Sequence, residues 1–171
     1  MIKLKDLLKE SYVWERKFGE KLPTLADVQR KKLKEDLLTE GTRWNVAIEL
    51  PNGKVAAVYG HWDGYPQHVG KLLKQHYKNP AKIKQLLKFG KNGISSLDKD
   101  IKGGKDHSFD NPVKGQTVFY GRDRGEKHNM TSTYKSREDF GRSFGEEFGY
   151  VYSIKDKRWY YYDYHGREKT L

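Results

Sequence analysis

A β-hairpin restricts the fold of this chain more than any other feature of its sequence. Residues 44–50 and 54–59 are rich in the aliphatic and aromatic residues typical of strands, and Pro51-Asn52-Gly53 between them tolerates a tight turn. Strands joined by so short a turn pair antiparallel, and one face of the resulting sheet needs a cover. The hairpin therefore predicts a sheet with a second layer packed against it.

The segments beyond residue 60 supply further strands and the covering layer. Strands are predicted over residues 116–120, 149–154 and 158–164, the last two as a second hairpin around Asp156-Lys157. Helices are predicted over residues 69–77, where Leu72, Leu73 and His76 face inward, from Asn79-Pro80 to Gly90, and from a Ser136 cap to Phe144. Together these elements predict an α+β fold, with an antiparallel sheet of four to five strands and helices packed on one face.

The pattern of apolar residues changes from helical to strand-like at Gly41. Residues 3–10 and 25–38 place leucines at helical spacing among lysines and acidic residues, whereas strand patterns begin directly after Gly41. We therefore expect an amphipathic helical leader over residues 1–40 and one globular α+β domain over residues 41–171. The absence of cysteine excludes disulfides, thiolate nucleophiles and sulfur-ligated zinc.

Positive charge is concentrated in one part of the chain. The formal net charge is +11, and residues 71–105 hold ten lysines against two aspartates, a net of +8. Such a field attracts polyanions, so the expected partner is an anionic ligand, a nucleotide or nucleic acid, or an acidic protein. Lys71, Lys74 and Lys78 form the predicted basic patch. The alternative is a set of solubilising lysines on outer helix faces. No apolar run is long enough to cross a membrane, and no cofactor is expected.

The first candidate site is the glycine- and proline-rich loop after the first hairpin. His61, Asp63, Tyr65 and His68 fall within eight positions, and such groups hydrogen-bond a phosphate or move a proton. Their spacing matches no metal signature, so no metal is predicted. In the structural alternative Trp62 and Tyr65 fill the core, Gly64 adopts a positive φ and Asp63 caps backbone amides.

The second candidate site follows the strand at residues 116–120. Its members are Arg122, Asp123, Arg124 and Glu126, and the two arginines would form a fork for phosphate or carboxylate if the strand continued. The alternative is a cluster in which these charges pair with one another.

A binding protein is favoured over an enzyme, and two alternatives remain open. One is a phosphodiesterase-like hydrolase that uses His61, Asp63, His68 and His107, and it requires at least two of these histidines to share a pocket. The other is a structural protein of a larger particle, which predicts a large exposed apolar patch.

Two segments of the domain resemble a family of proteins encoded by tailed phages and some bacteria. They are the loop His61-Trp62-Asp63-Gly64-Tyr65-Pro66 with His68 and Gly70, and the strand-loop Tyr120-Gly121-Arg122-Asp123-Arg124-Gly125-Glu126. The resemblance covers residues 41–171 and implies a phage source without implying an activity. The corresponding hypothesis is a phage accessory protein of the host-takeover or anti-defence type, whose acidic partner would be an acidic host protein. With a phage source, the structural alternative becomes a structural virion protein.

The leader resembles the capsid-targeting propeptides of T4-like phages, which a prohead protease removes after Leu-x-Glu or Ile-x-Glu. Leu8-Lys9-Glu10, Leu33-Lys34-Glu35 and Leu38-Thr39-Glu40 fit this rule. Since the last triplet falls directly before Gly41, the resemblance implies cleavage after Glu40. It also implies a location in the virion interior, the host cytoplasm or both.

Overall fold

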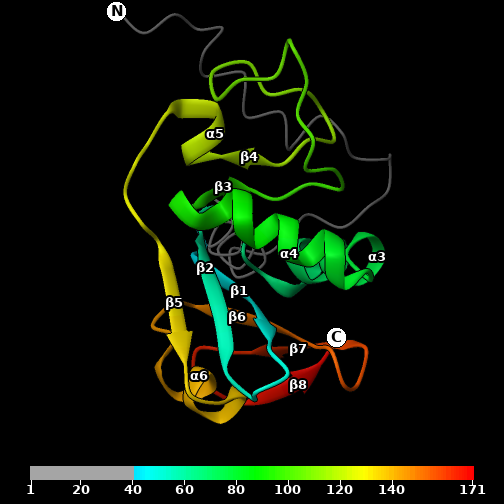
Figure 1. Cartoon of the computed structure of the whole chain (residues 1–171), viewed down its shortest axis with the longest axis vertical. Coiled ribbons are helices and arrows are strands. Elements are labelled where there is room, and N and C mark those ends of the chain that lie inside the picture. The colour runs from blue at the N-terminus through cyan, green and yellow to red at the C-terminus, as the bar shows by residue number, and fades with distance from the viewer. Residues whose placement is uncertain (1–40) are drawn as a thin grey trace, which may run out of the picture. The chain divides into compact units, whose positions relative to one another are not determined.

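A computed structural model of the chain describes residues 41–171. Eight strands form one sheet in the order β4-β3-β2-β1-β6-β7-β8, and β5 pairs with β2 off this path (Figure 1). The strands are β1 (Trp44–Glu49), β2 (Val55–Gly60), β3 (Ile94–Ser96), β4 (Val118–Phe119), β5 (Thr131–Tyr134), β6 (Phe148–Ser153), β7 (Arg158–Tyr162) and β8 (Glu168–Thr170). The helices are α3 (Lys71–His76), α4 (Pro80–Phe89), α5 (Tyr120–Arg124) and α6 (Arg137–Ser143), with short turns η2 (Pro66–Gly70) and η3 (Gly90–Asn92).

Both predicted hairpins are present. β1 and β2 pair antiparallel from Trp44 opposite Gly60 to Glu49 opposite Val55. Their turn closes through Gly53, which has a φ of +78° and donates its N–H to the Leu50 carbonyl. β6 and β7 form the second hairpin, in which Lys157 takes the left-handed turn position with a φ of +54°.

The α+β class predicted from the sequence is confirmed, but the sheet is larger than expected and mixed. β1 pairs antiparallel with β2 on one side and parallel with β6 on the other. β2 also pairs parallel with β3, through Gly60 and Ile94. Three strands absent from the prediction, β3, β5 and β8, span only three or four residues each, too short for a recognisable period of two.

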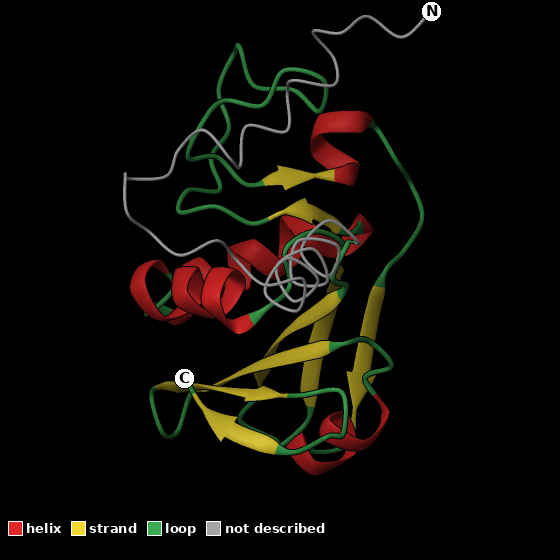
Figure 2. Cartoon of the chain, turned by 180° about the vertical axis from the view of Figure 1, so that it is seen from behind, coloured by secondary structure: helices red, strands yellow, loops and turns green. Residues whose placement is uncertain are grey.

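Helices cover both faces of the sheet, not one face as predicted (Figures 1 and 2). On the first face, Leu73 of α3 with Ile83 and Leu86 of α4 pack against a cluster that includes Trp44 and Tyr150. On the second face Phe140 of α6 packs with a smaller cluster, made of Ala47, Val55, Ala57, Phe144, Val151 and Tyr162. Because β1 is central, alternate residues of this strand face each layer and nearly all of them are buried.

The helix boundaries agree well with the sequence patterns. Asn79 caps α4 by accepting a hydrogen bond from the Ala81 N–H at 2.8 Å, and Ser136 caps α6 by accepting one from the Asp139 N–H at 3.1 Å. The predicted helix at residues 69–77 is divided into η2 and α3, and His76 is exposed instead of facing the core. The predicted loop after β4 begins with the short helix α5.

A long connection between β3 and β4 is tied to the rest of the domain by a buried tyrosine. The Tyr77 hydroxyl donates to the Asp98 carbonyl at 2.5 Å and lies 3.2 Å from the Thr117 hydroxyl. Asp100 and Gln116 form a parallel bridge between the two arms of this connection. Among the described helices, none combines the length and apolar character required to span a bilayer.

Candidate functional site

The predicted loop site is divided between two environments. His61 lies beside Tyr59, whose hydroxyl is 2.6 Å from His61 Nδ1. His68 packs against Tyr65 with ring centroids 5.8 Å apart, and within residues 41–171 its Nδ1 is buried without a hydrogen-bond partner. The half-buried Asp63 side chain forms no ion pair within that range. The four residues therefore do not converge on one ligand position.

The backbone of this loop is fixed by close packing. Asp63, not Gly64, adopts the left-handed conformation, with a φ of +58°. Gly64 is required for space, because a Cβ at this position would lie 2.5 Å from the Thr42 carbonyl oxygen and from Trp44 Cδ1. The Tyr150 hydroxyl donates to the Gly64 carbonyl at 2.6 Å. Trp62 is 43% exposed and does not fill the core.

Arg122 and Asp123 form an internal ion pair in place of a ligand fork. Arg122 donates to both Asp123 carboxylate oxygens, at 2.6 and 2.8 Å, and to the carbonyls of Ile101 and Thr117. Burial alone would raise the pKa of Asp123, but hydrogen bonds from Arg122 and Phe119, with the Arg122 charge, hold it below its ordinary value. All of these groups are used in joining α5 to the β3–β4 connection.

His107 belongs to the same internal cluster. Its Nδ1 accepts the Val113 N–H at 3.1 Å, which places the proton of the neutral ring on Nε2. Nε2 lies 3.3 Å from an Asp123 carboxylate oxygen, but outside hydrogen-bond geometry. Since the His107 side chain is 1% exposed, it has no access to a substrate in this conformation.

Parts of the two predicted sites do meet, in a cleft of about 600 Å³ that we call the tyrosine cleft. Its lining includes Tyr59, His61, Tyr120, Arg124, Glu126 and Glu146. Arg124 pairs with Glu126 at 3.2 Å and stacks over the Phe109 ring, so its charge is already partly neutralised. Neither His68 nor His107 lines this cleft, and it therefore does not provide the histidine pair that the hydrolase alternative requires.

Arg43 sets the electrostatics at one side of the tyrosine cleft. Burial and the Arg43 charge lower the pKa of His61. Burial first and the Glu146 charge second raise the pKa of Tyr59, and the charge and hydrogen bond of Arg43 oppose that rise, so the Tyr59 hydroxyl keeps its proton and shares a hydrogen bond with His61 Nδ1. Burial also raises the pKa of Glu146.

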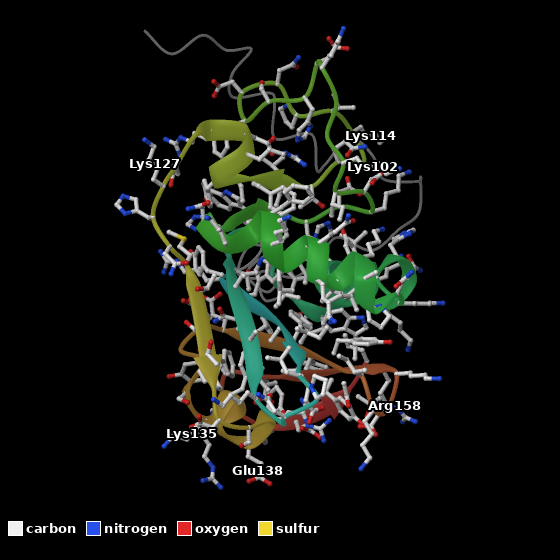
Figure 3. The ribbon with its side chains drawn as sticks, viewed as in Figure 1. Lys102, Lys114, Lys127, Lys135, Glu138 and Arg158 are labelled. Atoms are coloured by element: carbon white, nitrogen blue, oxygen red, sulfur yellow. The ribbon has the colours of Figure 1, made fainter. Side chains whose placement is uncertain are left out.

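A second cleft, of about 450 Å³, gathers basic side chains that the sequence does not place together. This lysine cleft is lined by His76, Lys82, Lys99, Asp100, Lys102 and Lys114. Figure 3 shows Lys102 and Lys114 close together, with Lys127 on the opposite flank of the view. Within residues 41–171, no lysine of this cleft forms an ion pair with a carboxylate.

Pairing between the two arms of the β3–β4 connection builds the lysine cleft. The Asp100 N–H donates to the Gly115 carbonyl at 3.0 Å, and the Thr117 N–H donates to the Asp100 carbonyl at 2.7 Å. Lys82 joins α4 to this connection, since its ammonium donates to the carbonyls of His76 and Lys99 at 3.0 and 2.6 Å. Lys82 thus forms part of the wall, whereas the exposed Lys99, Lys102 and Lys114 keep their ammonium groups available.

The field in the lysine cleft is positive. Burial lowers the pKa of Lys82. Burial acts to raise the pKa of Asp100, but N–H groups of Ile101 and Lys102 and the charges of Lys102 and Lys82 hold that pKa below its ordinary value. Asp100, the carboxylate that the described residues contribute to the lining, is thus stabilised as an anion by its surroundings.

The predicted basic patch is not part of this lining. Lys71, Lys74 and Lys78 are exposed on or just after α3, and the residue of that region that lines the lysine cleft is His76. Lys99 and Lys102 belong to the positive stretch at residues 71–105, and this local excess of charge was the only feature of the sequence that pointed to them as binding residues. Lys114 lies outside that stretch and reaches the cleft through the pairing of the two arms.

The leader, with its predicted cleavage after Glu40, lies outside the described residues. No family model, curated protein or solved structure matches this chain.

Proposed function

We propose that this protein binds a phosphate-bearing ligand, a nucleotide or nucleic acid, in the lysine cleft. The observation that carries the proposal is that, among the described residues, Lys99, Lys102 and Lys114 line one concavity whose wall includes Lys82 and whose one carboxylate is Asp100. Phosphate oxygens supply the acceptors that unpaired ammonium groups lack, and counterions released from a polyanion favour such binding at low salt. Lysines act as point charges, so we expect contacts with phosphates without recognition of base sequence.

Binding of a labelled single-stranded oligonucleotide to the full chain, followed by fluorescence anisotropy, tests the proposal. Charge reversal at both Lys102 and Lys114 should weaken binding at low salt by at least about tenfold, and the affinity should fall steeply as salt increases. Unlabelled ATP added to the complex shows whether a mononucleotide occupies the same cleft.

The matched control reverses charge at Lys127 and Lys135. Both are exposed, and Figure 3 shows them away from Lys102 and Lys114. The control has the same net charge as the cleft variant, so a general loss of electrostatic attraction affects both proteins equally. Equal loss in the two variants, or no retention of oligonucleotide or ATP by the wild-type chain, contradicts the proposal. Binding of an acidic protein would then be the better explanation of the charge.

The setting of this activity is proposed from the resemblance to phage-encoded proteins. An accessory protein that acts on nucleotides or nucleic acid in an infected cell fits the lysine cleft. An N-terminus at Gly41 in protein isolated from virions would support packaging with removal of the leader.

A further inference from the structure

The tyrosine cleft shares no lining residue with the lysine cleft and has a different chemical character. It lies on the sheet face that α6 covers only in part. Asn45 and Tyr59 are directly opposite each other in the β1–β2 pair, so they share this face with the buried Ala47 and Ala57. The face is therefore apolar beside α6 and polar where the cleft opens.

Aromatic rings form much of the rest of the cleft. Tyr120 lies edge-on to His61 with centroids 6.3 Å apart, and its ring also contacts Phe109, outside the lining, at 5.7 Å. Phe144 contributes a further ring to the lining, held by stacking on Phe140 at 5.3 Å. A flat heteroaromatic ligand gains stacking or edge contacts from such walls, whatever its hydrogen-bonding pattern.

Among the described residues that line the cleft, one carboxylate has no hydrogen-bond donor. Tyr59 is bonded to His61, Arg124 to Glu126, and the Asn45 amide donates to the Phe144 carbonyl at 2.9 Å. By contrast, the half-buried Glu146 carboxylate interacts with the charge of Arg43 but forms no hydrogen bond or close ion pair with any residue of the 41–171 range. A carboxylate in this position is stabilised by a ligand that offers two N–H donors side by side.

We propose that the tyrosine cleft binds a guanine base, with the N1–H and 2-amino groups of the base donating to the Glu146 carboxylate. Guanine presents these two donors on one edge, whereas adenine presents a donor beside an acceptor and suits an amide better. The base is uncharged, in keeping with a cleft where, among the described residues, Glu126 and Glu146 are balanced by Arg124 in the lining and by the nearby charge of Arg43. This site is additional to the phosphate-binding function proposed above and does not depend on it.

Calorimetric titration of the full chain with guanosine tests the assignment without any phosphate contact. Guanosine should bind, and inosine, which differs only by lacking the 2-amino group, should bind at least about tenfold more weakly. Glu146→Gln should weaken guanosine binding by a similar factor, because one of its two acceptors is replaced by a donor. Failure of wild-type protein to bind guanosine, or equal affinity for inosine, overturns the proposal.

Glu138→Gln is the matched control, since Glu138 is an exposed glutamate of α6 that does not line the cleft. Its affinity for guanosine should stay within about twofold of wild type, and an equal loss in both variants overturns the proposal. The Lys102 and Lys114 charge-reversal variant should keep its guanosine affinity. That comparison tests the two proposals separately. If the wild-type chain binds guanosine but no oligonucleotide, only the lysine-cleft proposal fails. If it binds oligonucleotide but no guanosine, only the tyrosine-cleft proposal fails.

Discussion

Arg122 donates hydrogen bonds from two guanidinium nitrogens to the carboxylate of Asp123, the next residue in the chain. The pair lies within α5 and is anchored to the β3–β4 connection by two further bonds from Arg122 to backbone carbonyls. The guanidinium also sits 4.8 Å from the centroid of the Phe119 ring. These contacts explain why Arg122, which the sequence suggested as half of a phosphate-binding fork, stabilises the fold instead.

Removal of the Arg122 side chain should lower the stability of the fold. Arg122→Ala leaves the Asp123 carboxylate, which is 3% exposed, without its charge partner, and we expect a loss of about 3 kcal/mol in the free energy of unfolding. Arg124→Ala removes a guanidinium that is 55% exposed and should cost less than about 1 kcal/mol. Urea denaturation of both variants gives the comparison, and similar losses would show that the Arg122 pair is not a structural anchor.

The same pair predicts a dependence of stability on acid. The pKa of Asp123 is lower in the folded state than its ordinary value of about 3.8. A lowered folded pKa stabilises the protein fully above the unfolded pKa, and this contribution is lost as pH falls through the folded pKa. The difference in unfolding free energy between wild type and Asp123→Asn should thus shrink as pH falls below about pH 4. A difference that stays unchanged down to pH 3 would contradict this assignment.

Gly60 should tolerate no side chain. A Cβ there would lie 2.1 Å from Cε2 of the fully buried Trp44 ring, so Gly60→Ala forces a shift in the largest side chain of the core. We expect a loss of at least about 3 kcal/mol, measured as a lower urea midpoint. Gly104 is the control, because it has an ordinary φ and no atom within 4 Å of the added Cβ. Gly104→Ala should change stability by less than about 1 kcal/mol.

Arg43 should control the protonation of His61. Burial comes first and the Arg43 charge second in lowering the pKa of His61, so Arg43→Gln should move that pKa back toward its ordinary value. NMR titration of the imidazole resonances measures the change directly. Arg158→Gln removes an equal charge at an exposed position on β7 and should leave the His61 titration unaltered. A shift of the same size in both variants would attribute the effect to net charge.

Local patterns were sufficient for the hairpins and for the longer helices. The turn at Gly53 and the caps at Asn79 and Ser136 each depend on neighbouring residues, which a sequence displays directly. The parallel pairing of β1 with β6 has no such signal, because the segments are brought together across the whole domain. The Asn45 amide and the Phe144 carbonyl, 99 positions apart, are in hydrogen-bond contact for the same reason.

The clefts were predictable to a smaller extent. His61, Arg124 and Glu126 were singled out as polar groups near glycines, and all three line the tyrosine cleft. Tyr59 was missed because it reads as an ordinary strand residue, and Glu146 because nothing in its neighbourhood marks it. The lysine cleft depends on the pairing of the two arms of the β3–β4 connection. The net charge counted along the sequence therefore indicated the region of its lysines but not which of them lie together.

Parallel pairing of the central strand also has a consequence during synthesis. One edge of Trp44–Glu49 finds its partner only when Phe148–Ser153 has been translated. At about 5–20 residues per second, that delay is roughly 5 to 20 seconds. Throughout this interval a nascent chain carries an apolar strand with an open edge, the kind of segment that pairs with other chains. Overproduction should therefore yield aggregates unless a chaperone occupies that edge until the ribosome releases the C-terminal hairpin.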